Sequence, residues 1–169
     1  MISQNQNGEF ALFDQGKLIG FAALKHINGV RVVESMFDRI VALQNAAAAD
    51  QIHLTLSSGL RSWDEQMHLR IQNVIDKSKQ HDLDFLTTAP STDFRPATAK
   101  PGWSNHQDGQ AYDFNVSSFT AIYAWMVKNA IHFNFVRTVS GERWHWEFKP
   151  GKDQFSFVPR TNPTWDGLV

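Results

Sequence analysis

Two histidines and one aspartate in the sequence could together hold a metal ion. Asp113 follows His106 at a spacing of His-x6-Asp, and His145 comes later in the chain. Two imidazoles and one carboxylate are a common ligand set for catalytic zinc, with a fourth position left for water. The chain contains no cysteine, so a metal site here can consist only of imidazole and carboxylate ligands. Spacing alone leaves a second interpretation open, in which these are strand residues whose charges face solvent.

A second acidic residue, Glu142, lies three residues before His145. A carboxylate this close to a metal site can take a proton from a bound water and later pass it to a leaving amine. Trp144 and Trp146 flank His145, and we expect both to pack on the face of a strand opposite to it. If a metal ion with a bound water is held there, the pattern suits hydrolysis, and the interpretation as solvent-facing strand residues stays open.

The remaining five histidines do not stand in motifs with other potential metal ligands. Each stands alone in an expected element or loop, where a histidine is usually a surface or hydrogen-bonded residue. They are His26, His53, His68, His81 and His132. We assign none of them to the site.

The elements that must position the candidate residues do not alternate regularly between helices and strands. Apolar periodicity predicts helices over 33–50, 63–79 and 119–130, and strands over 54–56, 111–116, 135–136 and 143–148. A hairpin is expected from 9–12 and 17–21, and a long proline-rich loop over 84–101. This order favours an α+β fold with a small, mainly antiparallel sheet and helices packed on it. We expect one domain over 1–169, with an N-terminal flap at 1–30 and a C-terminal tail at 149–169.

Three local signals refine these elements. Ser62 stands at an expected helix N-cap with Glu65 three residues later, which is the capping-box spacing. Alternation over 111–116 places Asp113 on the face opposite to Tyr112. Asn134 is expected in the left-handed turn that follows a helix.

Composition excludes several classes of protein. Lys and Arg number 16 against 17 Asp and Glu, and this balance lacks the basic footprint of a nucleic-acid binder. Hydrophobic residues make up 42% of the chain, which excludes a disordered protein, and no apolar stretch is long enough to span a membrane. The first residues show neither the basic segment nor the apolar segment of a secretory signal peptide. We expect a monomer with no nucleic-acid partner and no membrane span.

Three motifs, in order along 34–148, resemble the VanY-type D-alanyl-D-alanine carboxypeptidases. The wider group of zinc peptidases includes the D-Ala-D-Ala dipeptidases, the L-Ala-D-Glu endolysin peptidases and the hedgehog signalling domain. The motifs are Ser58-Gly59-Leu60-Arg61-Ser62 with Glu65-Gln66, Ser104-x-His106 with Asp113, and Glu142-x-Trp144-His145. Three separated motifs in register are a specific signal, whereas each alone would be weak.

The resemblance implies one catalytic zinc ion, held by His106, Asp113 and His145 in a surface cleft. It implies that Glu142 is the catalytic base and acid. Arg61 would steady the substrate carbonyl or the developing oxyanion, because a fixed guanidinium stabilises growing negative charge. A peptide hydrolase of this type would act on the peptidoglycan stem peptide, at the bacterial cell wall or in the periplasm.

Further residues receive less central roles or depart from the family. We expect Ser104, Gln66 and Trp144 to help position the peptide. Leu60 replaces the usual tyrosine of the first motif, which changes the expected pocket shape but not the chemistry. Asn134 stands where the family often has glycine.

The run Trp-His-Trp-Glu resembles the VanY type more than the endolysin type, so we expect a D,D-carboxypeptidase that removes the terminal D-Ala. One alternative is an L-Ala-D-Glu or other cell-wall endopeptidase, either an endolysin or a secreted effector. A second is a non-haem iron oxygenase, which also uses two histidines and a carboxylate, but at a shorter first spacing. A third is a non-catalytic, zinc-containing module that binds the cell wall. Export would depend on lysis, on a secretion system or on a longer original chain.

Overall fold

The strands that carry Asp113 and His145 lie next to each other in a four-stranded antiparallel sheet. The computed structural model describes residues 4–80, 98–116 and 120–151. Its strands are β1 (Phe10–Asp14), β2 (Lys17–Ala22), β3 (Leu24–Ile27), β4 (Val30–Val33), β5 (Leu56–Ser58), β6 (Ala111–Phe114), β7 (Phe135–Val136) and β8 (His145–Phe148). The order in the four-stranded sheet is β5-β6-β8-β7, and β1-β2 and β3-β4 form two separate hairpins. The prediction of an α+β fold with small antiparallel sheets is confirmed.

The described residues contain three α-helices and one short 3-10 helix. They are α1 (Glu34–Ala49), α2 (Trp63–Gln80), α3 (Ala121–Asn129) and η1 (Ala130–Phe133). All three predicted α-helices are therefore present, although residue 119 at the predicted start of α3 lies outside the described residues. None of the helices in the described ranges is both long enough and apolar enough to cross a membrane.

The chain divides into two compact units. The first comprises Met1–Ala22 and Arg61–Asp108, and the second comprises Ala23–Leu60 and Gly109–Val169. The expectation of a single domain with a flap and a tail stays a prediction. Most of the 84–101 loop and of the C-terminal tail lies outside the described residues.

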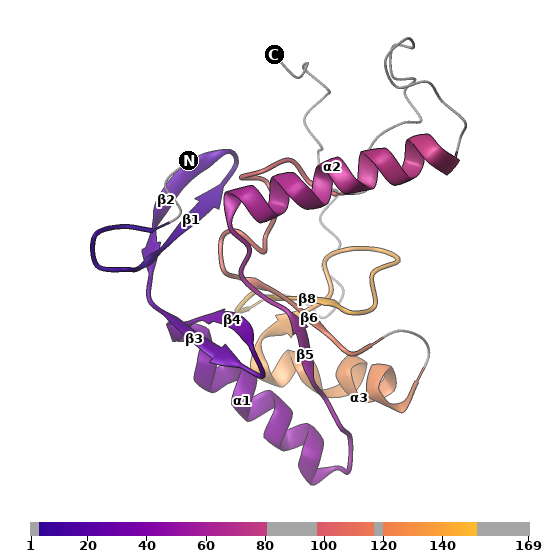
Figure 1. Cartoon of the computed structure of the whole chain (residues 1–169). Helices are drawn as coiled ribbons and strands as arrows, with labels where there is room; N and C mark the ends of the chain where they lie inside the picture. The colour runs from indigo at the N-terminus through magenta and orange to yellow at the C-terminus, as the bar shows by residue number, and fades with distance from the viewer. Residues whose placement is uncertain (1–3, 81–97, 117–119, 152–169) are drawn as a thin grey trace. The chain divides into compact units, whose positions relative to one another are not determined.

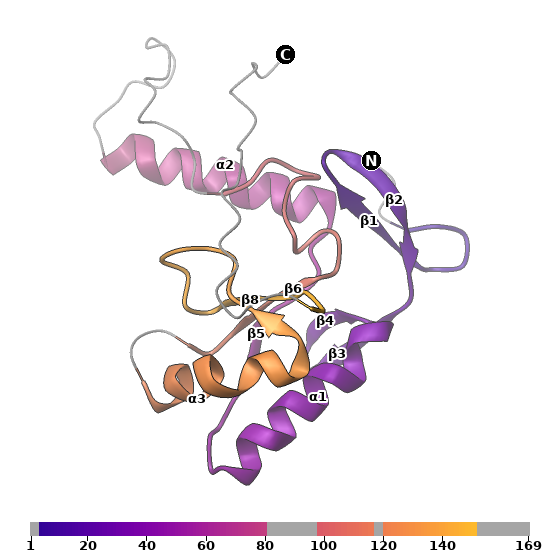
Figure 2. The same cartoon turned by 180° about the vertical axis from the view of Figure 1, so that it is seen from behind.

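The second unit is built on the four-stranded sheet. In both views α1 and α3 lie on the same side of this sheet (Figures 1 and 2). Helix α1 buries Met36, Ile40, Leu43 and Ala47, which recur at three- and four-residue spacing. All four residues of β6 are buried, including Asp113. The face that carries Asp113 is therefore no more exposed than the face that carries Tyr112.

Hairpin β3–β4 was not predicted. Asn28 and Gly29 form its two-residue turn, with φ values of 50° and 82°. Both values lie in the left-handed region that this kind of turn requires, and Asn-Gly is the pair that adopts it most readily. The hairpin lies against α1 and next to β5, so it belongs to the second unit.

Several predicted strands have different ends in the structure. Strand β5 begins at Leu56, two residues later than predicted, and includes Ser57 and Ser58. Strand β6 ends at Phe114, two residues earlier than predicted. The side chain of the next residue, Asn115, accepts the Thr55 N–H and donates to the His53 carbonyl. Strand β8 begins at His145 rather than at residue 143.

The first unit contains hairpin β1–β2, helix α2 and the loop before β6. Helix α2 begins with the predicted capping box. The backbone N–H of Glu65 donates to the Ser62 hydroxyl at 3.1 Å, and the Ser62 N–H donates to the Glu65 carboxylate at 2.7 Å. The ring of Trp63 packs edge-on against Phe13 of β1, with centroids 5.0 Å apart. The first turn of α2 is therefore fixed both by its cap and by an aromatic contact.

Candidate metal centre

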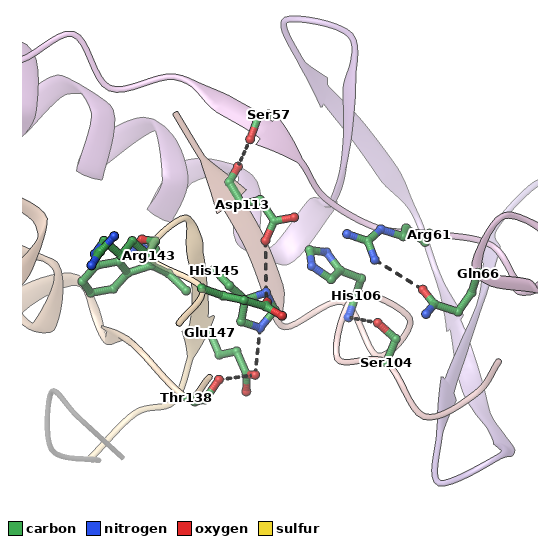
Figure 3. A network of polar contacts seen from close by, with 12 residues as sticks. Ser57, Arg61, Gln66, Ser104, His106, Asp113, Thr138, Arg143, His145 and Glu147 are labelled. Atoms are coloured by element: carbon green, nitrogen blue, oxygen red, sulfur yellow. Dashed lines mark hydrogen bonds and ion pairs between the residues drawn. The ribbon is translucent and has the colours of Figure 1, made fainter. Parts of the chain in front are cut away.

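Asp113 and His145 are brought together by the pairing of β6 with β8. The two residues are directly opposite each other in the antiparallel ladder, and both side chains are buried. The Nδ1 atom of His145 lies 3.0 Å from Oδ1 of Asp113 (Figure 3). On the other side of β6, the Ser57 hydroxyl donates to the Asp113 carbonyl oxygen at 3.1 Å. The sheet register therefore fixes both backbones and brings the two side chains into contact on one face of the sheet.

The second ring nitrogen of His145 contacts Glu147, a residue that the sequence analysis did not assign to the site. Nε2 lies 3.1 Å from Oε1 of Glu147 (Figure 3). The Thr138 hydroxyl donates to the same carboxylate oxygen, and Lys149 Nζ lies 3.5 Å from the other one. Glu147 is 1% exposed. A buried carboxylate with three polar partners is a built feature of the site rather than a surface charge.

The two carboxylates determine the protonation of His145 in the metal-free chain. Burial lowers the pKa of His145, but its hydrogen bonds and charge interactions with Asp113 and Glu147 outweigh this effect and raise the pKa to about 9. Burial raises the pKa of Glu147, but its bonds to His145 and Thr138 outweigh that effect and lower the pKa to about 2. Both directions describe one buried ion pair, in which the histidine carries a proton and the glutamate does not.

The metal-free chain is therefore expected to lose stability as pH rises above neutrality. Because the pKa of His145 is about 9 in the folded chain against 6.5 in the unfolded one, its contribution is complete below pH 6.5 and is lost as pH rises through about 9. Urea unfolding in the presence of a chelator, at pH 6.5 and at pH 9, measures this loss. His145→Gln should remove this part of the pH dependence. An equally steep decline in that variant would contradict the assignment to His145.

Glu142 lies on the same side of the His145 ring as Asp113. Its Oε2 is 4.0 Å from His145 Nδ1, and its side chain is about one-third exposed. It precedes β8 in a turn, where the backbone N–H of His145 donates to the Glu142 carbonyl. Solvent therefore reaches the Glu142 carboxylate, whereas Asp113 and Glu147 are buried.

In the first unit, a tight turn presents His106. The Gln107 N–H donates to the Ser104 carbonyl at 2.7 Å, and the His106 N–H donates to the Ser104 hydroxyl at 3.4 Å. The His106 carbonyl accepts the backbone N–H of Arg61 at 3.1 Å. Ser104 therefore supports the backbone that carries His106, and its expected contact with a peptide stays a prediction.

Gln107, next to His106, is fully buried and was not singled out from the sequence. Its Oε1 accepts the N–H of Gly102 at 2.6 Å, and its Nε2 donates to the Ser62 carbonyl at 3.3 Å. Its backbone carbonyl accepts the N–H of Phe13 in β1. One amide side chain and its backbone thus join the turn of His106 to β1 and to the start of α2.

The guanidinium of Arg61 is held by Gln66. Arg61 Nη1 donates to Gln66 Oε1 at 3.3 Å, and Gln66 Nε2 donates to the Ala99 carbonyl at 2.9 Å (Figure 3). Gln66 is 1% exposed. Arg61 lies two residues before α2, and Gln66 lies in the first turn of that helix. Gln66 orients Arg61 in the structure, and its direct contact with a peptide stays a prediction.

The predicted metal ligands are residues of suitable chemistry. His106 in the first unit, with Asp113 and His145 in the second, could hold a metal ion, and each offers one ligand atom. All three residues are buried. No other group of three or more potential ligand residues is found in the described part of the chain. Two imidazoles and a carboxylate fit a catalytic zinc, which needs a fourth position for water.

Trp144 does not occupy the place expected for it. Trp146 is fully buried, and its indole N–H donates to the Arg143 carbonyl at 2.9 Å. Trp144 is 40% exposed and precedes β8. The expectation that both tryptophans pack behind His145 is therefore wrong for Trp144. The reason is that β8 begins one residue after it, so strand alternation does not apply to Trp144.

Comparison with known proteins gives a consistent picture. The family described as VanY, D-alanyl-D-alanine carboxypeptidase, matches residues 30–151. A D-alanyl-D-alanine carboxypeptidase of Enterococcus faecalis is 26% identical over 135 residues, which are 72% of this chain and 49% of that protein. The chain thus spans about half the length of that relative.

Two solved structures show that the fold is shared. VanYB in complex with D-alanine-D-alanine has a TM-score of 0.66 and 24% identity, over 81% of this chain and 84% of the other. A mutant of the D,D-pentapeptidase VanY from the VanB-type resistance cassette, in complex with Zn(II), has a TM-score of 0.63 and 23% identity. That match covers 88% of this chain and 86% of the other.

Proposed function

Because the chain belongs to the VanY family of D-alanyl-D-alanine carboxypeptidases, we propose that it is a zinc-dependent hydrolase of peptidoglycan stem peptides. Within that class we propose a D,D-carboxypeptidase, which removes the terminal D-Ala. The observation that carries the proposal is the contact of Asp113 with Nδ1 of His145, with Glu142 beside the same nitrogen and His106 as the third residue of the ligand group.

The proposed ligands of the zinc ion are His106, Asp113 and His145. When bound there, zinc would supply Lewis-acid chemistry, lowering the pKa of a water to about 7 and polarising a carbonyl. Without metal, His145 is protonated and its Nδ1 faces Asp113, so metal binding requires that Nδ1 loses its proton. The binding of zinc should therefore strengthen as pH rises.

Glu142 is the proposed general base and acid. Its carboxylate is close to Nδ1 of His145 and is reached by solvent, whereas Asp113 and Glu147 are buried and already hydrogen-bonded. Glu142 takes a proton from the attacking water and then donates it to the departing amine of D-Ala. No other group is needed for this transfer, because the proton that Glu142 takes from water is the one that it gives to the amine.

Arg61 is the proposed partner of the developing oxyanion. Its guanidinium is held by Gln66, which is itself bonded to the Ala99 carbonyl. A charge that is oriented before the substrate arrives requires little reorganisation when negative charge develops, and this favours the transition state. Ser104 and Trp144 remain proposed as positioning residues for the peptide, the latter as an exposed aromatic surface.

We infer that the chain acts at the bacterial cell wall or in the periplasm, where peptidoglycan peptides are found. A monomer remains the proposed oligomeric state.

The proposal predicts the release of one D-Ala from a stem pentapeptide ending in D-Ala-D-Ala. The zinc-loaded chain is incubated with this peptide and with a matched peptide ending in D-Ala-L-Ala, and the products are identified by mass spectrometry. We expect loss of a single D-Ala from the first peptide only, abolished by a chelator and restored by zinc. Internal cleavage would identify an endopeptidase, and zinc binding without cleavage of either peptide would favour a wall-binding module. An oxidised product that forms only with iron and dioxygen would favour the oxygenase class.

A further inference from the structure

Glu147 is a buried carboxylate that the proposed reaction does not use. It lies two residues after His145 on β8, so both side chains leave the strand on the same face. Its neighbours across the sheet are Ala111 on β6 and Val136 on β7. Ala111 is small and fully buried, which leaves space on this face of the sheet for the glutamate and the imidazole.

The two nitrogens of His145 have different partners. Nδ1 faces Asp113 at 3.0 Å and Glu142 at 4.0 Å, whereas Nε2 faces Glu147 at 3.1 Å. An imidazole that binds a metal through one nitrogen usually donates the N–H of the other nitrogen to a carboxylate, which fixes the tautomer and the ring orientation. We propose that Glu147 is the positioning residue of His145. It accepts the Nε2–H and so leaves Nδ1 as the metal-binding nitrogen.

Glu147 is itself held in place on two sides. The Thr138 hydroxyl donates to Oε1, the oxygen that also faces His145 Nε2. Lys149 Nζ lies 3.5 Å from Oε2 and donates to Gln110 Oε1 at 2.7 Å. Thr138 and Lys149 thus prevent the carboxylate from turning away from the histidine. The inference rests on the proposed function only in that His145 is a metal ligand.

The chain offers a matched pair of substitutions for the test. Glu142 and Glu147 lie on opposite sides of one imidazole, near Nδ1 and Nε2 respectively. Glu147→Gln should weaken zinc binding by about 10- to 100-fold, which is the usual cost of losing such a partner. Glu142→Gln should leave zinc affinity within a few-fold of the unchanged protein. Competition with a chromophoric chelator measures both affinities, and equal affinities for the two variants would overturn the proposal.

A second measurement separates positioning from a merely structural role. In the zinc-loaded protein labelled with nitrogen-15 histidine, the His145 Nε2–H should give a strongly downfield proton signal, because it is bonded to a carboxylate. Loss of the signal in His145→Gln assigns it. Glu147→Gln should move it upfield, whereas a residue that only fills the core would lower stability without moving it. An unmoved signal in the folded variant contradicts the proposal.

Thr138→Val serves if Glu147→Gln does not fold. It removes one hydrogen bond to Glu147, so the same signal should move upfield and zinc affinity should fall by a smaller factor. An unchanged spectrum would contradict the proposal. The readouts also distinguish this inference from the proposed function. If zinc binds through His145 but no peptide is cleaved, only the proposed hydrolysis fails. If His145→Gln leaves zinc affinity unchanged, both fail.

Discussion

Glu142→Gln is expected to lower kcat for D-Ala release by about 10²- to 10⁴-fold, the range typical for loss of a general base and acid. The amide has nearly the same shape as the carboxylate but cannot take a proton from water. Glu142 is not one of the three proposed ligands, so zinc content after dialysis should stay at one ion per chain. Release of D-Ala from the pentapeptide and elemental analysis measure the two results.

The matched control for Glu142 is Glu34→Gln. Glu34 is an exposed glutamate at the start of α1, 3.4 Å from Lys25. Exposed pairs of this kind contribute little to stability, so this variant should keep the activity of the unchanged chain. If Glu142→Gln keeps more than about one-tenth of that activity, another group moves the proton, and the assignment of Glu142 as base is wrong.

Phe135→Ala is expected to lower the free energy of unfolding by about 3–5 kcal/mol, the usual cost of removing a buried phenylalanine. Phe135 is fully buried in β7, and its ring packs edge-on against the rings of Tyr112, Phe114 and Phe148. The centroid distances are 6.3, 6.1 and 5.9 Å. One substitution therefore removes contacts to two other strands of the sheet, β6 and β8. Urea unfolding at fixed pH, with zinc absent, measures the loss.

Phe37→Ala is the matched control for Phe135. Phe37 lies on α1 and is only half-buried, with Lys25 Nζ 4.9 Å from its ring centroid. Less apolar area is removed there, so the loss of stability should be clearly smaller. A similar loss for both variants would show that the aromatic contacts of Phe135 contribute no more to the free energy of unfolding than those of a half-buried phenylalanine.

The proposed metal ligands could be chosen from the sequence because their chemistry restricts the choice. Without cysteine, only imidazole and carboxylate ligands remain, and His106, Asp113 and His145 fall within motifs of specific order and spacing. What the sequence alone does not give is the pairing of β6 with β8, which sets Asp113 opposite His145. That register depends on contacts between segments far apart in the chain.

Two features were missed although the sequence contains a signal for each. Asn28-Gly29 between two apolar segments is typical of a tight hairpin, and β3–β4 is that hairpin. Glu147 follows His145 at the two-residue spacing of one strand face, which places a carboxylate beside the imidazole. Its burial and its bond to Thr138 depend on tertiary packing, so the sequence could have predicted only the strand face on which Glu147 lies.

The position of Trp144 could not be derived from periodicity. Strand alternation predicts sides only within a strand, and whether a strand begins at residue 143 or at His145 depends on hydrogen bonds to its neighbours. In the structure the Trp144 carbonyl accepts the N–H of Phe114, yet Trp144 precedes the regular part of β8. A shift of two residues at a strand end is small for the fold, but it decides whether this indole is buried or exposed.

The pairing of Asp113 with His145 also bears on how the sheet selects its own alignment. A slip of one residue between β6 and β8 would turn His145 to the opposite face and leave Asp113 without its partner. A metal that binds only the correctly aligned pair would favour that alignment over its slipped alternatives during folding. The residues proposed for hydrolysis would thus also help to select the correct register of the two strands that carry them.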